Sequence, residues 1–142
     1  MPDKWNSKRV VKRVARLIEK NMGAAMLILQ GEVQRKISVG QPVVRSKGGS
    51  LRGTVKAQPA PTPPRVLSGR LRTSITHSVE GSLLTRMIIG RVGSNVPYAR
   101  RLELGFFGTD SKGRNINQGE RPYLRPALKE NLPKLIARLT RG

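Results

Sequence analysis

The stretch Gly93–Leu128, GSNVPYARRLELGFFGTDSKGRNINQGERPYLRPAL, carries the two motifs that organise the rest of the chain. The first, Tyr98–Gly105, predicts one or two turns of helix, because a proline precedes it and a glycine ends it. The second, Arg121–Leu128, uses two prolines to fix an extended approach and then leads into a last helix. The fold therefore depends on how these two motifs meet across the polar loop between them.

Glu103 stands out within the first motif, because it is one of 8 acidic residues in a chain with 28 lysines and arginines. We expect it to be a structural ion-pair partner rather than a general acid or base, since no second titratable group of a suitable kind accompanies it. A partly buried bidentate pair would fix how the two motifs meet. The near candidates for its partner are Arg100, Arg101, Arg121 and Arg125.

Four segments around these motifs form an ordered set, namely Ser68–Ile75, Val92–Ala99, Leu102–Gly105 and Arg121–Leu128. In order and approximate spacing, the set resembles the tail-completion or head-tail joining family of tailed phages. This family is the minor tail or neck component of lambdoid siphophages and is related to the lambda gene Z product. The resemblance covers about the last half of the chain, and the region from 41 to 65 has no counterpart in it.

The resemblance implies a structural virion protein without catalysis, located at the neck or head-proximal end of the tail and assembled in the host cytoplasm. Such a protein forms a homo-oligomeric ring, most simply a hexamer, that docks the tail to the head connector or stopper. It also adjoins the tail terminator or tail-tube proteins and lets genomic DNA pass. The motif residues, at a subunit contact or in support of the fold, are Gly69, Leu71, Ile75, Gly93, Tyr98, Ala99, Glu103, Gly105, Arg121, Pro122, Leu124 and Pro126.

Length and composition set the outer limits. A chain of 142 residues predicts a single domain, 1–142, that is large enough for one core. The absence of cysteine excludes disulfides, cysteine-based zinc sites and a thiol nucleophile. The single histidine, His77, predicts a solvated or hydrogen-bonded side chain, and we expect no metal, no cofactor and no enzymatic activity. We also expect no membrane partner, because the longest apolar run is too short for a span and no signal peptide opens the chain.

The formal net charge of +20 is the strongest compositional fact, and such a surface binds polyanions of many kinds. No Asp or Glu occurs from Val33 to Val79. This basic stretch predicts contact with DNA phosphates or with the acidic face of a neighbouring ring, and a solvated loop is the plain alternative. A second function is therefore open, a small basic protein that binds nucleic acid without sequence preference. The basic residues of the predicted arm are Arg45, Lys47, Arg52, Lys56 and Arg65.

Taken in order, the chain begins with a long helix over 1–40, capped at Asn6 or Ser7 and ending near Gly40. An extended basic arm rich in proline and glycine follows over 41–66. The remainder, 67–142, holds a sheet and a C-terminal helix. Lysines and arginines cluster in the first half of this helix, and a basic amphipathic helix that lies on a membrane or a nucleic acid is the alternative to packing. We expect packing, with the apolar face of the helix on the sheet through Val10, Val14, Leu17, Ile18, Met22, Ala25, Met26, Leu29 and Val33.

Within 67–142, Ser68 caps a short helix through Arg70, Leu71 and Ile75. Two strands, Ser74–Val79 and Thr85–Gly93, are joined by a turn at 80–82, and Gly90 marks a bulge or a close approach. Residues 108–119 read as a polar, flexible loop. The last helix, Ala127–Leu139, presents one apolar face, with a kink or restart near Asn131 caused by Pro133. The whole predicts an α+β domain, in which a long N-terminal helix and a C-terminal helix pack on a small, mostly antiparallel sheet. The face predicted for the last helix consists of Ala127, Leu128, Leu132, Leu135, Ile136 and Leu139.

Overall fold

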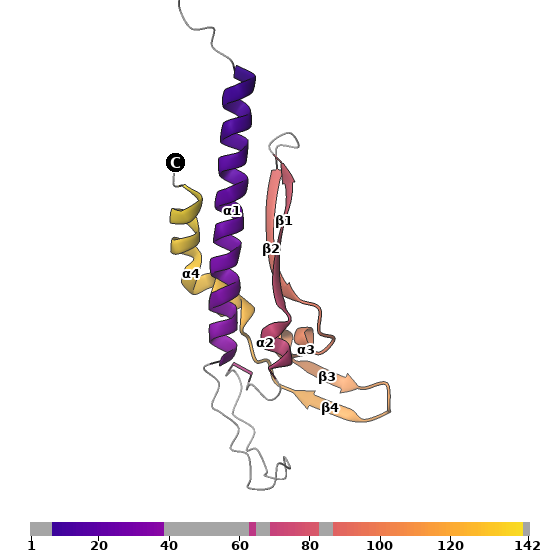
Figure 1. The fold of residues 1–142 in the computed structure, drawn as a ribbon. Coiled ribbons are helices and arrows are strands. Elements are labelled where there is room, and N and C mark those ends of the chain that lie inside the picture. Colours follow the sequence, from indigo (N-terminus) through magenta and orange to yellow (C-terminus); the bar gives the residue numbers. More distant parts are fainter. Residues whose placement is uncertain (1–6, 39–62, 65–68, 83–86, 141–142) are drawn as a thin grey trace, which may run out of the picture.

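The computed structural model describes residues 7–38, 63–64, 69–82 and 87–140. Its elements confirm the α+β class, with a long first helix and a C-terminal helix (Figure 1). The strands form two separate antiparallel sheets of two strands each, instead of the single small sheet expected. The predicted basic arm lies almost wholly outside the described residues, which include only Pro63 and Pro64 of it. The elements are α1 (Ser7–Ser38), α2 (Arg70–Thr73), β1 (Ile75–Ser82), β2 (Met87–Ser94), α3 (Ala99–Leu104), β3 (Phe106–Thr109), β4 (Asn115–Gln118) and α4 (Leu124–Leu139).

Helix α1 forms where apolar residues recur every three or four positions, and its two parts differ in burial. From Asn21 onward its inner face is buried, whereas Val10, Val14 and Leu17 are exposed. The expectation that the whole stripe packs on the sheet is therefore wrong for the first turns. Figure 1 shows the reason, since α1 extends beyond the described ends of β1 and β2 and beyond the end of α4.

The β1–β2 hairpin lies along α1, and Gly90 allows the close approach that the sequence suggests. A Cβ built at Gly90 would overlap the Sδ atom of Met26 and lie 2.6 Å from its Cγ atom. The register is continuous through this position, where Val79 pairs with Gly90, so Gly90 marks a close approach and not a bulge. The predicted turn at 80–82 is wrong, because these residues continue β1 and pair with β2.

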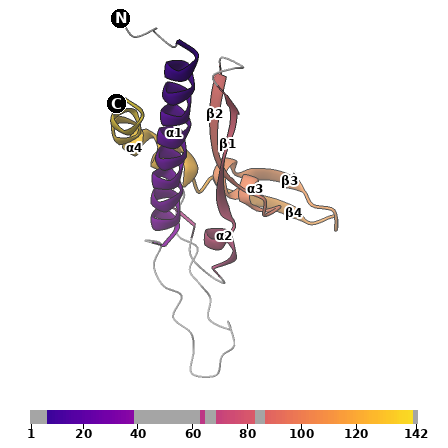
Figure 2. The same ribbon diagram turned by 45° about the horizontal axis from the view of Figure 1, so that its top comes forward.

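The second hairpin, β3–β4, replaces the flexible loop expected over 108–119. Its strands pair from Phe106 with Gln118 to Thr109 with Asn115. The turn is held by Asp110, whose Oδ1 atom accepts the backbone N–H groups of Lys112 and Arg114, both at 2.9 Å. A local side-chain acceptor thus builds the turn that hydrophobic pattern alone does not predict. Figure 2 shows this hairpin standing away from β1 and β2.

Helix α4 differs from its prediction in start and in face. It begins at Leu124, three residues before the predicted start, and its ribbon bends along its length in Figure 1, as expected for a helix that contains Pro133. Its buried residues are Ala127, Asn131 and Leu135. The Asn131 side chain is accommodated because its Nδ2 atom donates to the Ala127 carbonyl oxygen at 2.9 Å. Of the remaining members of the predicted apolar face, Leu139 is partly buried against the core, whereas Leu128, Leu132 and Ile136 are exposed.

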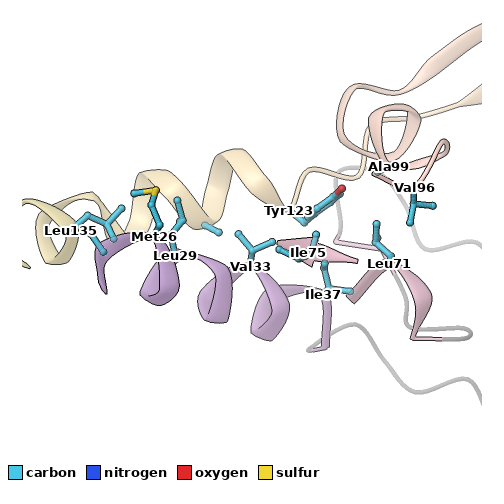
Figure 3. Close-up of a cluster of buried hydrophobic side chains, with 12 residues drawn as sticks. Met26, Leu29, Val33, Ile37, Leu71, Ile75, Val96, Ala99, Tyr123 and Leu135 are labelled. Carbon is cyan, nitrogen blue, oxygen red and sulfur yellow. The ribbon is translucent and has the colours of Figure 1, made fainter. Parts of the chain in front are cut away.

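The hydrophobic core lies where α1, β1, α3 and α4 meet (Figure 3). The largest side chains that are fully buried are Tyr123, Ile37, Ile75 and Val33. The short helix α2 ends at Thr73, so Ile75 opens β1 instead of continuing the helix as predicted. Gly69 precedes α2 with a left-handed backbone, and Leu71 points into the core (Figure 3). The residues of the core are Ala25, Met26, Leu29, Val33, Ile37, Leu71, Ile75, Val96, Ala99, Tyr123, Ala127 and Leu135.

Candidate functional site

The two motifs of the sequence meet at the carboxylate of Glu103, which is 7 % exposed. Its Oε2 atom accepts the backbone N–H groups of Tyr123 at 2.8 Å and Leu124 at 3.0 Å, and its Oε1 atom accepts that of Arg125 at 2.9 Å. The expectation of a structural role for Glu103 fits this geometry. The donors in these bonds are backbone amides at the start of α4, however, and not the guanidinium group that was expected. We call this arrangement the Glu103 junction.

The junction satisfies the first turn of α4 completely. An α-helix leaves its first backbone N–H groups without partners inside the helix. Tyr123 is the N-cap residue and its side chain makes no capping bond, but Glu103 accepts the N–H groups of the cap and of the next two residues. Pro126 at the following position has no N–H group. The Glu103 carboxylate on α3 therefore caps α4 in place of a side chain at the N-cap position. Its negative charge also interacts favourably with the positive end of the α4 helix dipole.

Further backbone contacts hold the same two segments together. The Arg121 N–H donates to the Leu102 carbonyl oxygen at 2.6 Å, directly beside the Glu103 contacts. Gly105, which ends α3, has φ 73° and ψ 171°, a conformation that is open essentially only to glycine. A Cβ at Gly105 would also lie 3.0 Å from the Gln118 carbonyl oxygen. The glycine that closes the first motif is thus required by both its backbone angles and its neighbours.

Tyr123 lies at the centre of the junction with 0 % of its surface exposed. Among the described residues its hydroxyl group has no hydrogen-bond partner. Figure 3 shows the ring between α1 and the segment of Val96 and Ala99. Burial raises the pKa of Tyr123 to about 12, and the neighbouring Glu103 carboxylate adds to the rise. The hydroxyl group therefore stays protonated at neutral pH, and the ring acts as a packing group.

Three large apolar side chains near this buried junction in sequence are exposed. Tyr98 is the N-cap residue of α3, Leu104 is the last residue of α3, and Phe107 on β3 is 72 % exposed. We call these three residues the α3–β3 patch. The guanidinium carbon of Arg101 lies 4.4 Å from the centre of the Phe106 ring, which places a cation over the aromatic ring next to the patch. Large exposed apolar side chains that gather beside charged ones are typical of protein interaction surfaces.

The motif residues divide into an inner and an outer group. Leu71, Ile75, Ala99 and Glu103 are buried and support the fold, while Tyr98 is exposed. The first three share the core with Tyr123, so segments from both sides of the polar loop come together. The arm residues Arg45, Lys47, Arg52, Lys56 and Arg65 lie outside the described residues. The half-buried members of the motif set are Gly69, Gly93, Gly105, Arg121, Pro122, Leu124 and Pro126.

Sequence reasoning missed two groups that shape this region. Asp110 builds the β3–β4 turn, and the pattern of an aspartate followed three residues later by Gly113 was the available signal. Gln30 on α1 donates to the Ile75 carbonyl oxygen at 2.8 Å and also bonds the His77 ring, which confirms that His77 is hydrogen-bonded. The polar side chain of Gln30 within a helix gave no sign of this role.

The described residues contain no group of three or more histidine, aspartate or glutamate side chains placed to hold a metal ion. In the same part of the chain, no helix has the length and apolar character needed to cross a membrane. No protein-family model, curated protein or solved structure matches the chain.

Proposed function

We propose that the protein is a structural component of a tailed-phage virion and forms a ring, a hexamer, at the junction of head and tail. In this role it completes the tail end, docks it to the head connector or stopper, adjoins the tail terminator or tail-tube proteins and leaves a channel for genomic DNA. The proposal rests on the motif resemblance stated above. The Glu103 junction supports it, because the segments that carry the resemblance form one structural unit.

A ring requires a heterologous contact, in which one patch meets a different patch on the next copy. The α3–β3 patch of Tyr98, Leu104 and Phe107 supplies one exposed apolar surface. The second is the row formed by Leu128, Leu132 and Ile136, which we call the α4 patch. The two patches lie on different elements, so the patch of one copy can meet the other patch of the next in a head-to-tail contact. We propose that the α3–β3 patch of one copy meets the α4 patch of the next.

Charge controls when such a ring can close. Each copy carries a formal net charge of +20, so neighbouring copies repel one another in dilute buffer. Salt at about 0.15 M reduces the Debye length to about 8 Å, and an acidic partner ring would have the same effect locally. We therefore expect the oligomer to grow more stable as salt rises, unlike a complex held by ion pairs.

The test is the solution mass of the full chain, measured by light scattering at moderate and at high salt, with and without short duplex DNA. The informative variant is Phe107→Ser, which removes an exposed apolar group from the α3–β3 patch. Its matched control is Asn117→Ser, because Asn117 pairs with Phe107 across the hairpin and is also exposed. We expect a DNA-independent ring that Phe107→Ser dissociates and Asn117→Ser leaves intact.

A monomer that assembles only when a tail-tube or connector protein is added also supports the proposal. A stable monomer that ignores those proteins and coats DNA stoichiometrically overturns it. That result would favour the alternative of a small, basic nucleic-acid-binding protein without sequence preference.

A further inference from the structure

The first half of α1 carries a separate basic surface that neither the motifs nor the predicted arm includes. Between Ser7 and Lys20 the helix holds six lysines and arginines and a single acid, Glu19. All six basic residues are exposed. We call them the α1 basic face, and they are Lys8, Arg9, Lys12, Arg13, Arg16 and Lys20.

Helical spacing places these cations on one side of α1. Successive residues turn by about 100°, so Lys8, Lys12, Arg16 and Lys20, spaced four apart, form one slowly rotating row. By the same geometry Arg16 and Lys20, together with Arg9 and Arg13, lie roughly opposite the inner face that begins at Asn21. Lys8 and Lys12 lie in the directions of Met26 and Gln30, which contact the hairpin further along α1. All six side chains are exposed, and α1 extends beyond the described ends of β1 and β2 and beyond the end of α4 (Figure 1), so a large partner can approach the α1 basic face.

The composition of this face identifies the chemistry of the partner. Protein interfaces bury an apolar core within a polar rim. On the side of α1 that carries the six cations, no apolar residue occurs between Ser7 and Lys20. Leu27 is the first exposed apolar residue on that side. A bilayer surface fits less well, because the apolar residues of these turns, Val10 and Val14 among them, lie on the side of α1 that leads into the core. A regular row of charge without apolar surface matches a phosphate backbone.

We propose that the α1 basic face binds the phosphate backbone of duplex DNA without sequence preference. Lys8 to Lys20 span about 18 Å of helix axis, along which a DNA duplex carries about ten phosphates. Six cations along this length can therefore meet phosphates of one duplex segment. Lysine and arginine contacts to phosphate fix position and affinity but carry no base information. The inference goes beyond the proposed ring and does not require it.

The test is fluorescence anisotropy of the full chain with a labelled duplex of about 20 base pairs, titrated at about 50 to 200 mM salt. The variant Lys12→Gln/Arg13→Gln/Arg16→Gln removes three charges from the face. We expect its affinity to fall at least about tenfold and the slope of log affinity against log salt to become shallower by about 2 to 3.

The matched control removes the same net charge from three exposed positions elsewhere, as Arg72→Gln/Lys112→Gln/Lys129→Gln. We expect it to lose much less affinity than the α1 variant. Equal losses in the two variants would show that binding follows net charge alone, and would overturn the proposal. It is also overturned if the unaltered chain fails to bind the duplex, or if anionic vesicles bind it while the duplex does not.

A measurement on the unaltered chain keeps the test informative if the α1 variant folds poorly. Lysine acetylation, read by mass spectrometry with and without the duplex, should show protection at Lys8, Lys12 and Lys20. Lys112 and Lys129 serve as the unprotected reference, and equal protection of both groups contradicts the proposal. The same titration on the Phe107→Ser variant separates this inference from the ring, because DNA binding should persist when the oligomer does not.

Discussion

The Glu103 carboxylate and the Tyr123 backbone N–H lie 2.8 Å apart, although 20 residues separate them in the chain. Replacing the carboxylate leaves three backbone donors at the start of α4 without their acceptor. We expect Glu103→Ala to lower the free energy of unfolding by about 3 kcal/mol or more, since each buried donor that loses its partner costs about 1 to 3 kcal/mol. Urea denaturation measures this change.

Glu103→Gln should cost less, about 1 to 2 kcal/mol, because the amide keeps one acceptor oxygen and loses the charge that suits the helix dipole. The control is Glu120→Gln, an exposed carboxylate close by in sequence, which should change stability by less than about 0.5 kcal/mol. Equal effects at Glu103 and Glu120 would refute the capping role. Amide exchange at Tyr123 and Arg125 should accelerate only in the Glu103 variants.

Tyr123→Phe should leave stability unchanged or raise it by up to about 1 kcal/mol at neutral pH. The reason is that the buried hydroxyl group has no hydrogen-bond partner among the described residues, so its removal costs no bond. The control is Tyr98→Phe, at an exposed ring outside the core. A loss of more than about 1 kcal/mol in Tyr123→Phe would mean that the hydroxyl group makes a bond we have not identified.

The same residue predicts a loss of stability at alkaline pH. In the unfolded chain a tyrosine ionises near pH 10, whereas burial raises the pKa of Tyr123 to about 12 in the folded state. Between these values only the folded state keeps the proton, so rising pH favours unfolding. Relative to Tyr123→Phe, the unaltered chain should lose about 2 kcal/mol from about pH 10 to pH 12. Parallel stability curves for the two proteins across this range would contradict the assignment.

Gly90→Ala tests the packing of α1 on β2. The added Cβ overlaps the Met26 side chain, so we expect a loss of about 1 to 3 kcal/mol. Gly93→Ala, in the same strand, is the control, because a Cβ there meets nothing within 4 Å. Met26→Ala shortens the side chain that the added Cβ would overlap. Gly90→Ala should therefore lower the free energy of unfolding less in the Met26→Ala background than in the otherwise unaltered chain. If Gly93→Ala proves as costly as Gly90→Ala, strand propensity and not the α1 contact explains the effect.

Asp110→Ala tests the turn of the β3–β4 hairpin. It removes the acceptor for the Lys112 and Arg114 backbone amides, and the exchange of hairpin amides should accelerate. The effect should stay local, since this hairpin forms its own sheet. Ser111→Ala, at an exposed turn position, is the control. Broad acceleration across α1 and β1 would show that the hairpin supports the core.

The pKa of the Asp110 carboxyl group, measured by NMR titration, is a second test of the turn. The hydrogen bond from the Arg114 side chain holds the pKa of Asp110 below its ordinary value of 3.8. A lowered pKa means that the contribution to hairpin stability is present above about pH 3.8 and is lost as pH falls through the folded value. The Asp110 resonance should therefore titrate below 3.8. A midpoint at or above that value would contradict the bonded turn.

Local sequence patterns correctly predicted the helices that have a regular apolar period or a proline and a glycine at their ends. The 3.6-residue period gave α1, and the proline before Tyr98 together with Gly105 gave α3. The β3–β4 hairpin was missed because its strands, Phe106–Thr109 and Asn115–Gln118, are only four residues long and the second is largely polar. Its stability comes from side-chain bonds in the turn, which periodicity does not record.

Tertiary partners account for the other differences. Glu103 was expected to find an arginine, because sequence shows charges but not the free amides of a distant helix start. The buried face of α4 was misplaced because Asn131 satisfies its amide within the helix and replaces a leucine as an inner residue. The start of the α1 stripe, at Val10, Val14 and Leu17, is exposed because burial depends on how far the hairpin and α4 extend, and the stripe itself does not specify this.

The pairing of α1 with α4 determines when this protein can fold. Lys36 on α1 and Glu130 on α4 form an ion pair although 94 residues separate them. On a ribosome, α1 emerges before the β1–β2 hairpin and before α4, the helix that covers part of its inner face. The core therefore cannot close completely before α4 is made, and until then part of the apolar side of α1 remains uncovered.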